Sequence, residues 1–300
     1  MNDRTLRQVF VTGGAGFIGS YVVRHLVQAG VAVTALTRTP QPAQAGVTWL
    51  AGDLLAPSTW ATHLRGCDAV FHLAAAYSWQ ASAAVQLYAV NVGGTQAVLQ
   101  AAADAAVPLV VHTSTIGVIG LPADGSLPTE DTPFNLWPSG SAYVRSKWLG
   151  DAVTLWWAQR GLPVVLVHPT APVGAGDHKP TATGQRFVDF LAGKRPDYPV
   201  GGLNLCPVQD MAAGHVLAAQ RGAAGRRYIL GHAAGNLSED MFLQMLAEVS
   251  GQPIPPPVAR RTGRAPQTLT ANPQRAIREL GMPQSDLRTA FAAAVRGYSR

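Results

Sequence analysis

A glycine-rich stretch near the amino terminus constrains the fold more than any other feature of this chain. Its sequence is Val9-Phe10-Val11-Thr12-Gly13-Gly14-Ala15-Gly16-Phe17-Ile18-Gly19. A short apolar run rich in β-branched residues stops at the glycines, and an amphipathic run that ends at Gly30 follows. This pattern predicts a strand, a tight turn and a helix.

The three spaced glycines suit a bound pyrophosphate. Gly13, Gly16 and Gly19 would let the backbone turn sharply, approach the anion and pack the helix closely on the strand. The unpaired N–H groups of the first helical turn, with Phe17 and Ile18, would face the anion, with the helix dipole behind them. A glycine-rich turn can be purely structural, but phosphate binding requires this position between a strand and a helix. The stretch therefore predicts dinucleotide binding through these five residues.

Apolar runs and helical patterns alternate along most of the chain. Strands are expected at 31–36, 47–50, 68–76, 108–112 and 162–168, and helices at 88–106 and 142–160. The sequence therefore predicts an α/β Rossmann fold, a doubly wound parallel sheet, with a smaller C-terminal substrate-binding lobe. Strands at 204–208 and 227–230 are expected to return to the main sheet. Residues 1–168 and 204–232 would then form the dinucleotide-binding domain, and residues 169–203 and 233–300 the lobe.

Composition and charge narrow the class of protein. Of the 300 residues, 47% are hydrophobic and 13% charged, which is typical of a compact globule. The net charge of +6 comes from scattered residues, so we expect a basic surface, an exposed Arg260, Arg261 and Arg264 cluster, and no nucleic-acid partner. Cys67 and Cys206 are too few for a disulfide framework, and no leader, apolar span of membrane length or Cys/His metal pattern occurs. We expect a cytoplasmic protein without membrane insertion or metal.

The ends of the second and third strands bear on the cofactor. An acidic residue after the second strand would hold the ribose hydroxyls of NAD, but this chain has Arg38 there, which can pair with a 2′-phosphate. NADP(H) is therefore favoured and NAD(H) remains possible, while the alternative for Arg38 is a solvent-facing loop residue. Asp53 can accept a hydrogen bond from the adenine amino group, or it can cap the next helix.

Small and hydroxyl-bearing residues follow the next strands. Ala74, Ala75 and Ala76 would let the backbone lie against the cofactor, whereas His72 just before them is expected to be a packed core histidine. Asn91 lies on an otherwise apolar helix, so a buried hydrogen-bonding role near the cofactor is expected. Thr113-Ser114-Thr115 ends a central strand, beside the crevice where ligands bind, although each hydroxyl can also cap a turn.

Tyr143 and Lys147 are the candidate catalytic pair. Ser141 can cap a helix that ends at Gly161, and the four-residue spacing places both side chains on one face. The ordinary tyrosine pKa of about 10 is high for acid–base work at neutral pH, and a nearby ammonium and a cationic nicotinamide would lower it. Tyr143 would exchange a proton with the substrate oxygen while hydride moves at the neighbouring carbon. Thr115 would orient that oxygen, and Lys147 would also hold the nicotinamide ribose.

In combination these segments resemble the extended short-chain dehydrogenase/reductase family, also called the NAD-dependent epimerase/dehydratase family. The matching segments include the glycine-rich stretch, Gly52-Asp53-Leu54, Phe71-His72-Leu73-Ala74-Ala75, Asn91-Val92-Gly93-Gly94-Thr95, Tyr143-x-x-x-Lys147, His168-Pro169, Val173-Gly174-Ala175-Gly176-Asp177 and Arg278-Glu279-Leu280-Gly281. The resemblance implies a triad of Thr115, Tyr143 and Lys147, with Ser114 as the alternative hydroxyl. It implies cofactor contacts at the glycine turn, Arg38, Asp53, Leu54, Ala74 and Pro169, and a homodimer through a bundle that includes the 143–160 helix.

Within the family the chain resembles the dihydroflavonol reductase-like branch, in particular the hopanoid-associated sugar epimerase group. The segments that match are 168–184, Gly202-Leu203-Asn204-Leu205, Asp210 and Ala213-Gly214-His215, whereas Cys206-Pro207-Val208-Gln209-Asp210 departs from the family pattern.

Three functions remain open from the sequence. The first is an NADP(H)-dependent carbonyl reductase or alcohol dehydrogenase acting on a small molecule. The second is a nucleotide-sugar epimerase or dehydratase with tightly bound NAD(P), which needs a diphosphate site with Lys179, Arg186, Lys194 and Arg195 as candidates. The third is an NADPH-binding redox sensor without catalysis, against which the intact Tyr143 and Lys147 argue.

Overall fold

The computed structural model describes residues 3–78, 80–257 and 268–299. The arginine cluster at 260–264 lies outside these residues. Within the described ranges, no helix is long and apolar enough to cross a membrane. No group of three or more His, Cys, Asp or Glu side chains in the same ranges is placed to hold a metal ion.

The main sheet, within the described residues, has seven parallel strands in the order β3-β2-β1-β4-β5-β6-β9. Their bounds are β1 (Gln8–Thr12), β2 (Ala32–Thr37), β3 (Val47–Ala51), β4 (Ala69–His72), β5 (Val110–Thr113), β6 (Val164–Pro169) and β9 (Arg227–Leu230). The winding reverses between β1 and β4, as in a doubly wound fold. The predicted Rossmann fold is confirmed, and every strand predicted before residue 169 lies in this sheet.

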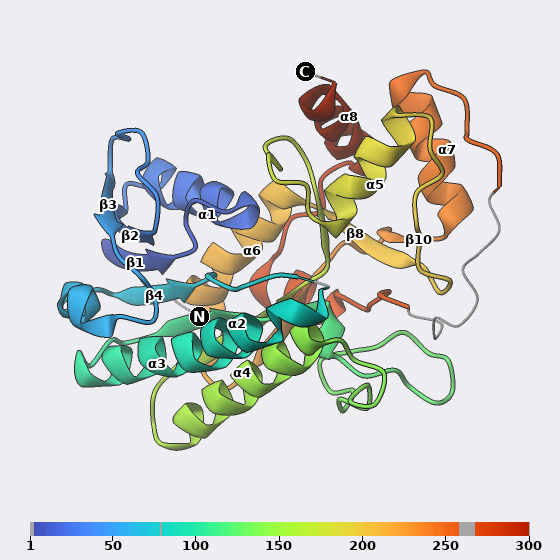
Figure 1. Cartoon of the computed structure of the whole chain (residues 1–300). Helices are drawn as coiled ribbons and strands as arrows, with labels where there is room; N and C mark the ends of the chain where they lie inside the picture. The colour runs from blue at the N-terminus through green and yellow to red at the C-terminus, as the bar shows by residue number, and fades with distance from the viewer. Residues whose placement is uncertain (1–2, 79, 258–267, 300) are drawn as a thin grey trace.

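Helices cover both faces of the sheet (Figure 1). On one face lie α1 (Phe17–Gln28) and α6 (Val208–Arg221), and on the other α2 (Ala84–Tyr88), α3 (Thr95–Asp104) and α4 (Ala142–Gln159). In β1, Val9 and Val11 pack in the core on the α1 side, and Phe10 packs in the core on the α3 side. Because both faces are buried, the strands are continuous apolar runs rather than alternating ones.

Helical segments match the predicted positions closely. The helix expected at 88–106 is one run in which α2 passes through a π-helical segment, η4 (Ala89–Gly94), into α3. Ser141 caps α4 as predicted, because its Oγ accepts a hydrogen bond from Val144 N at 3.3 Å. The remaining short segments are η1 (Pro57–Thr59), η2 (Ala61–Leu64), η3 (Ala81–Ala83), η5 (Ile116–Val118) and the π-helical η6 (Ala276–Leu280).

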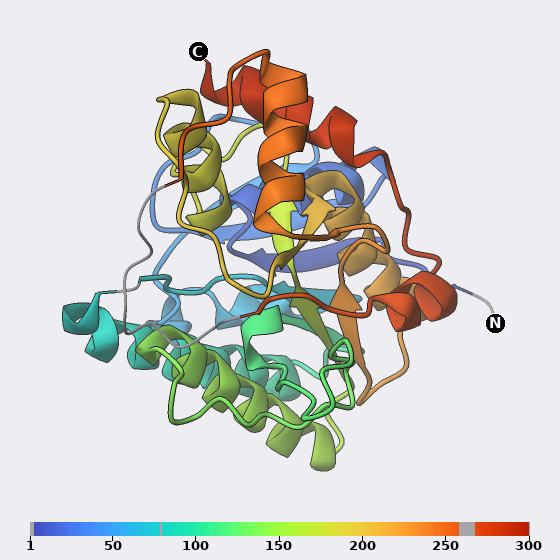
Figure 2. The same cartoon turned by 90° about the vertical axis from the view of Figure 1, so that its right-hand side faces the viewer.

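A second, three-stranded sheet among the described residues has the order β10-β8-β7. It contains β7 (Ala171–Val173), β8 (Leu203–Pro207) and β10 (Asn236–Leu237), with α5 (Ala182–Leu191), α7 (Glu239–Ser250) and α8 (Leu287–Tyr298) around it. Figure 2 shows α7 and α8 side by side above the main sheet, and Phe187, Phe242 and Phe291 form the centre of this second core.

The expectation that the strand at 204–208 returns to the main sheet is wrong. β8 pairs with β7 and β10, and the place beside β6 is taken by β9. The strand at 227–230 does return to the main sheet, as predicted. Both strands are largely apolar and buried, and an apolar run by itself carries no information about which sheet it joins.

Candidate functional site

The predicted site residues lie along one edge of the main sheet. Parallel strands share a direction, so residues at their carboxyl ends meet at the same edge, where open α/β sheets bind ligands. The glycine turn follows β1, Arg38 follows β2, Asp53 follows β3, Ala74 follows β4, Thr115 follows β5, and Pro169 ends β6. The fold therefore brings together residues that are more than 150 positions apart in the chain.

The glycine turn has the geometry that a phosphate-binding loop needs. Gly13 has a φ of 75°, and a Cβ there would lie 2.6 Å from the backbone N of Ala74. A Cβ at Gly19 would collide with the carbonyl oxygen of Gly13. Gly16 precedes α1, and among the described residues no side chain caps this helix and no acidic residue lies in its first turn. The first-turn N–H groups of α1 thus fit the pyrophosphate of a dinucleotide.

His72, the last residue of β4, links the end of β1 to the start of α3. Its Nδ1 lies 2.7 Å from Thr12 Oγ1, and its Nε2 lies 3.0 Å from Thr95 Oγ1. The Thr95 hydroxyl donates to Asn91 O, so Nε2 of His72 must donate to Thr95 and Nδ1 must accept from Thr12. Burial lowers the pKa of His72, in agreement with this neutral form. The prediction of a packed core histidine is confirmed.

Asn91 holds the small-residue turn in place. Its Oδ1 accepts from Ala76 N at 2.7 Å, and its Nδ2 donates to Ala76 O at 3.0 Å and to Ser146 Oγ at 2.9 Å. The side chain is 1% exposed, so the predicted buried hydrogen-bonding role is confirmed. These bonds join the turn after β4 to α4, the helix that carries Tyr143 and Lys147.

Tyr143 and Lys147 point from α4 to the end of β5. The Tyr143 hydroxyl interacts with the Thr115 side chain, and its ring stands edge-on to Tyr77, 4.8 Å between centroids. Lys147 is 3% exposed, and its Nζ donates to Thr113 O at 2.7 Å. Sequence reasoning missed Tyr77, because nothing in its neighbourhood in the chain points to α4.

The pKa values of this pair differ from expectation. Burial raises the pKa of Tyr143 above its ordinary value, Tyr77 adds to this, and the hydrogen bond from Thr115 opposes it only partly. Burial also lowers the pKa of Lys147 to about 8. In the protein chain by itself the expected acidification of the phenol by Lys147 is therefore wrong: the pKa of Tyr143 is raised, chiefly by burial, and Lys147 is not among the groups that shift it.

The three hydroxyls at the carboxyl end of β5 differ in their partners. Thr115 Oγ1 accepts from Gly117 N at 3.2 Å besides contacting Tyr143. Among the described residues, Thr113 Oγ1 and Ser114 Oγ are buried without a hydrogen-bond partner. Buried hydroxyls are rarely left unpaired, so these two atoms at the ligand-binding edge are available to a bound molecule.

The part of the site that follows β2 and β3 is more exposed to solvent. Arg38 is exposed directly after β2. Asp53 Oδ1 accepts from Leu55 N at 2.8 Å, so this carboxylate caps a turn and not the next helix, whose N-cap is Ala56. Leu54 is buried and fills the space left by Gly94, where a Cβ would lie 2.5 Å from the Leu54 side chain.

Two of the four cations considered for a diphosphate site are engaged within the lobe. Arg186 donates to Asp197 O at 2.7 Å and to Ala182 O at 2.8 Å. Arg195 pairs with Glu239 at 2.7 Å and donates to Pro255 O. Lys179 and Lys194 are exposed.

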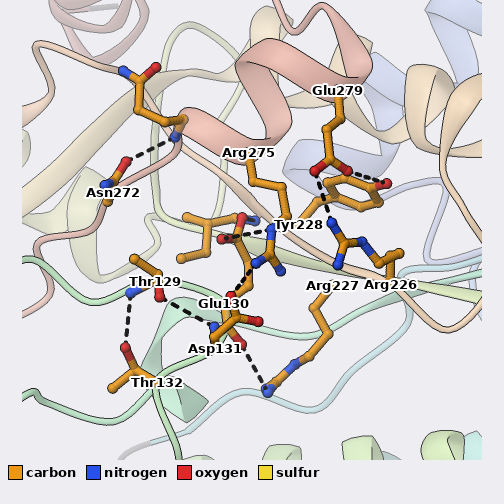
Figure 3. A network of polar contacts seen from close by, with 12 residues as sticks. Thr129, Glu130, Asp131, Thr132, Arg226, Arg227, Tyr228, Asn272, Arg275 and Glu279 are labelled. Atoms are coloured by element: carbon orange, nitrogen blue, oxygen red, sulfur yellow. Dashed lines mark hydrogen bonds and ion pairs between the residues drawn. The ribbon is translucent and has the colours of Figure 1, made fainter.

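The proline-rich loop at residues 117–140, before α4, is held against β9, an outermost strand of the main sheet (Figure 3). Its Glu130 is 3% exposed and accepts from Ile229 N at 2.8 Å. Arg275 pairs with Glu130 and Asp131, and Arg227 donates to Glu130 O. The loop is thereby held between β9 and the C-terminal segment.

Comparison with known proteins agrees with this geometry. Residues 9–231 match the model of the NAD dependent epimerase/dehydratase family. A protein of Synechocystis sp. named "putative dihydroflavonol 4-reductase" is 36% identical, covering 96% of this chain and 94% of that protein. Sterol demethylase protein B of Methylococcus capsulatus is 30% identical, covering 96% and 97%.

A solved structure is similar over nearly the whole chain. The dTDP-glucose 4,6-dehydratase of Streptomyces venezuelae, crystallised with NAD bound, has a TM-score of 0.84 at 30% identity and covers 97% of both chains. Together with the Rossmann sheet and the family match, these similarities identify an NAD(P)-dependent enzyme. The chain belongs to the NAD-dependent epimerase/dehydratase family of extended short-chain dehydrogenases/reductases.

Proposed function

We propose that this NAD(P)-dependent oxidoreductase is an NADP(H)-dependent carbonyl reductase or alcohol dehydrogenase in which Tyr143 is the acid–base group. The observation that carries the proposal is the convergence of Tyr143, Thr115 and the buried Lys147, whose Nζ donates to Thr113 O, at the carboxyl end of β5. A proton donor, an orienting hydroxyl and a cation at the carboxyl end of β5 are the groups that carbonyl reduction requires.

The residues at the carboxyl ends of the strands would hold the cofactor in one defined orientation. The first turn of α1 would bind the pyrophosphate, Arg38 the adenosine 2′-phosphate, and Lys147 the nicotinamide ribose. Gly16, Phe17, Ile18, Ala75, Ala76, Thr113 and Pro169 would line the path between these points. The bound nicotinamide supplies the hydride that reduces the substrate carbon.

The chain's own part in the reaction is proton transfer. Burial keeps Tyr143 protonated at neutral pH, which suits donation of its proton to the carbonyl oxygen as hydride reaches the carbon. Thr115, or Ser114 as the alternative, would orient that oxygen, and the Lys147 ammonium would stabilise the phenolate left behind. In the oxidative direction Tyr143, as the phenolate, would take up the proton of the substrate alcohol.

The lobe supports the reductase over the nucleotide-sugar epimerase. Such an epimerase would need cations for a diphosphate, and Arg186 and Arg195 are committed to carbonyls and a carboxylate of the lobe itself. The similarity to a protein named as a dihydroflavonol reductase points the same way, toward a carbonyl on an organic molecule without a diphosphate.

The test is to incubate the purified protein with NADPH and a panel of aliphatic and aromatic ketones. Net oxidation of NADPH with alcohol formation, lost in Tyr143→Phe, is the expected result. The matched control is Tyr228→Phe, which removes a buried phenol near the start of β9 that bonds Glu279. Epimer formation from a nucleotide sugar without net cofactor change would replace the proposal by the epimerase. Tight NADPH binding without turnover, unaltered in Tyr143→Phe, would replace the proposal by the NADPH-binding redox sensor.

Quaternary structure and location are the remaining predictions. A homodimer through α3 and α4 would cover Trp156, an aromatic residue on α4 that is 44% exposed. Light scattering of the wild type and of Trp156→Glu would test this dimer. A cytoplasmic location stays a prediction from the sequence.

A further inference from the structure

A buried group of ionisable side chains lies one turn of α4 beyond Lys147. Asp151 is 3% exposed, and its Oδ2 accepts a hydrogen bond from His168 Nε2 at 3.1 Å. Its Oδ1 lies 3.3 Å from His112 Nε2. Both imidazoles are fully buried, His112 on β5 and His168 on the neighbouring β6. The proposed proton transfer uses none of these three groups.

Asp151 and Lys147 reach the same strand end from the same helix face. They are four residues apart on α4, a spacing that makes side chains neighbours. Lys147 Nζ donates to the carbonyl of Thr113, and Asp151 lies against His112, the residue just before it. The ammonium and the carboxylate thus approach consecutive residues of β5.

In this group Asp151 is ionised, whereas His112 is neutral. Burial raises the pKa of Asp151, but the close contact with His112 and the hydrogen bond with His168 outweigh it and hold that pKa well below its usual range, so the carboxylate is ionised. Burial lowers the pKa of His112, so its imidazole is neutral at neutral pH. A buried anion acts strongly on a neighbouring buried cation, because little water screens them.

Other ionisable groups face the cluster from the elements packed around it. They are Tyr143 on α4, His72 on β4, Arg227 on β9, with its guanidinium 4.0 Å from Asp151 Oδ2, and Glu130 in the loop before α4.

We propose that Asp151 is a positioning residue that keeps Lys147 charged, with His112 and His168 holding its carboxylate in place. This proposal rests on the proposed function, since it concerns how the Lys147 ammonium, which that function uses, stays protonated although it is buried. Burial alone disfavours an ammonium, and a fixed anion one helical turn away restores the charged form. Among the described residues the cluster does not have the arrangement of a metal site.

The small number of lysines permits a direct test. The chain has three, Lys147, Lys179 and Lys194. In protein labelled with ¹³C at the lysine Cε, NMR titration of the full chain gives a midpoint for each, assigned with Lys179→Arg and Lys194→Arg. We expect Lys147 to titrate near pH 8 in the wild type. In Asp151→Asn its midpoint should fall by about one pH unit or more.

Two further variants serve as controls. Asp151→Glu keeps the charge and should retain most of the wild-type midpoint. Asp104→Asn removes an exposed carboxylate at the end of α3 that bonds only Gln100 among the described residues, and should leave the Lys147 midpoint unchanged. A folded Asp151→Asn protein with an unmoved Lys147 midpoint would overturn the proposal. So would a wild-type Lys147 that is already neutral at neutral pH, a result that needs no variant to fold.

The activity profile separates this inference from the proposed function. The basic limb of the kcat/KM profile for ketone reduction should move to lower pH in Asp151→Asn, by the same shift as the NMR midpoint. An unmoved limb and midpoint with normal loss of activity in Tyr143→Phe would refute only the role of Asp151. A shifted midpoint in a protein that reduces no ketone would refute only the proposed function.

Discussion

Gly13→Ala is expected to damage the protein through two separable effects. The φ of 75° at Gly13 costs a residue with a side chain about 1–2 kcal/mol. A Cβ there would also lie 2.6 Å from Ala74 N and 2.7 Å from the carbonyl carbon of Leu73. Both are backbone atoms at the end of a central strand, so they cannot move aside as the tip of a side chain can. Overpacking of this kind adds about 1–3 kcal/mol.

Gly30→Ala is the matched control. Gly30 has a φ of 77°, and a Cβ there would have no neighbour within 4 Å, so this variant carries the backbone strain without the collision. Urea denaturation should show a loss of about 1–2 kcal/mol for Gly30→Ala and about 2–5 kcal/mol for Gly13→Ala.

Cofactor binding should separate the two variants further. The collision pushes on Ala74, whose N–H donates to Thr12 Oγ1 at 3.2 Å across the turn that would hold the pyrophosphate. NADPH fluorescence titration should therefore show weaker binding for Gly13→Ala and near wild-type binding for Gly30→Ala. Equal stability losses, together with unchanged NADPH affinity for Gly13→Ala, would refute this reasoning.

Three further predictions concern catalysis, cofactor choice and pH. Tyr143→Phe should reduce kcat for ketone reduction by about 10²–10⁴-fold with NADPH affinity unchanged, and Thr115→Val should reduce it more than Ser114→Ala does; stopped-flow kinetics would check both, and a larger effect of Ser114→Ala would make Ser114 the orienting hydroxyl. Arg38→Ala should weaken NADPH binding by about 10–100-fold and leave NADH binding nearly unchanged, since a charged hydrogen bond is worth about 1.5–3 kcal/mol; equal losses for both cofactors would contradict a 2′-phosphate contact. Burial lowers the pKa of His215 to about 4 from its ordinary 6.5, so between these values the unfolded chain binds a proton that the folded chain does not. Its contribution to stability is therefore complete above pH 6.5 and is lost as the pH falls toward 4, by at most about 3 kcal/mol. Denaturation at several pH values should show a shallower loss in His215→Gln, and an unchanged slope would show that His215 is not the group responsible.

Tertiary structure decided which hydroxyl meets Tyr143. Ser114 and Thr115 are adjacent at the end of β5, and no periodicity distinguishes them. In the folded chain Thr115 contacts the phenol, whereas Ser114 Oγ has no partner among the described residues. The assignment depends on where α4 packs, and helix packing is a long-range property.

The pKa values of the pair also required the fold. The four-residue spacing of Tyr143 and Lys147 predicted a common helix face correctly. It could not predict that burial would raise the phenol pKa. Nor could it predict that Asp151 would lie between His112 on β5 and His168 on β6. The i, i+4 relation of Lys147 and Asp151 was the one local signal for that cluster, and it gains meaning only with His112 and His168 beside it.

What the sequence determined by itself was the local conformations and their order. Glycine spacing, apolar runs and the Ser141 cap predicted the strands, the turn and α4, and the parallel βα alternation placed their carboxyl ends along one edge. What only the tertiary structure decided was the pairing of β8 with β7 and β10, the burial of Glu130 and the partners of Asp151. Local backbone preferences act over a few residues, whereas strand partners, desolvation and charge neighbours arise from segments that meet only when the chain packs.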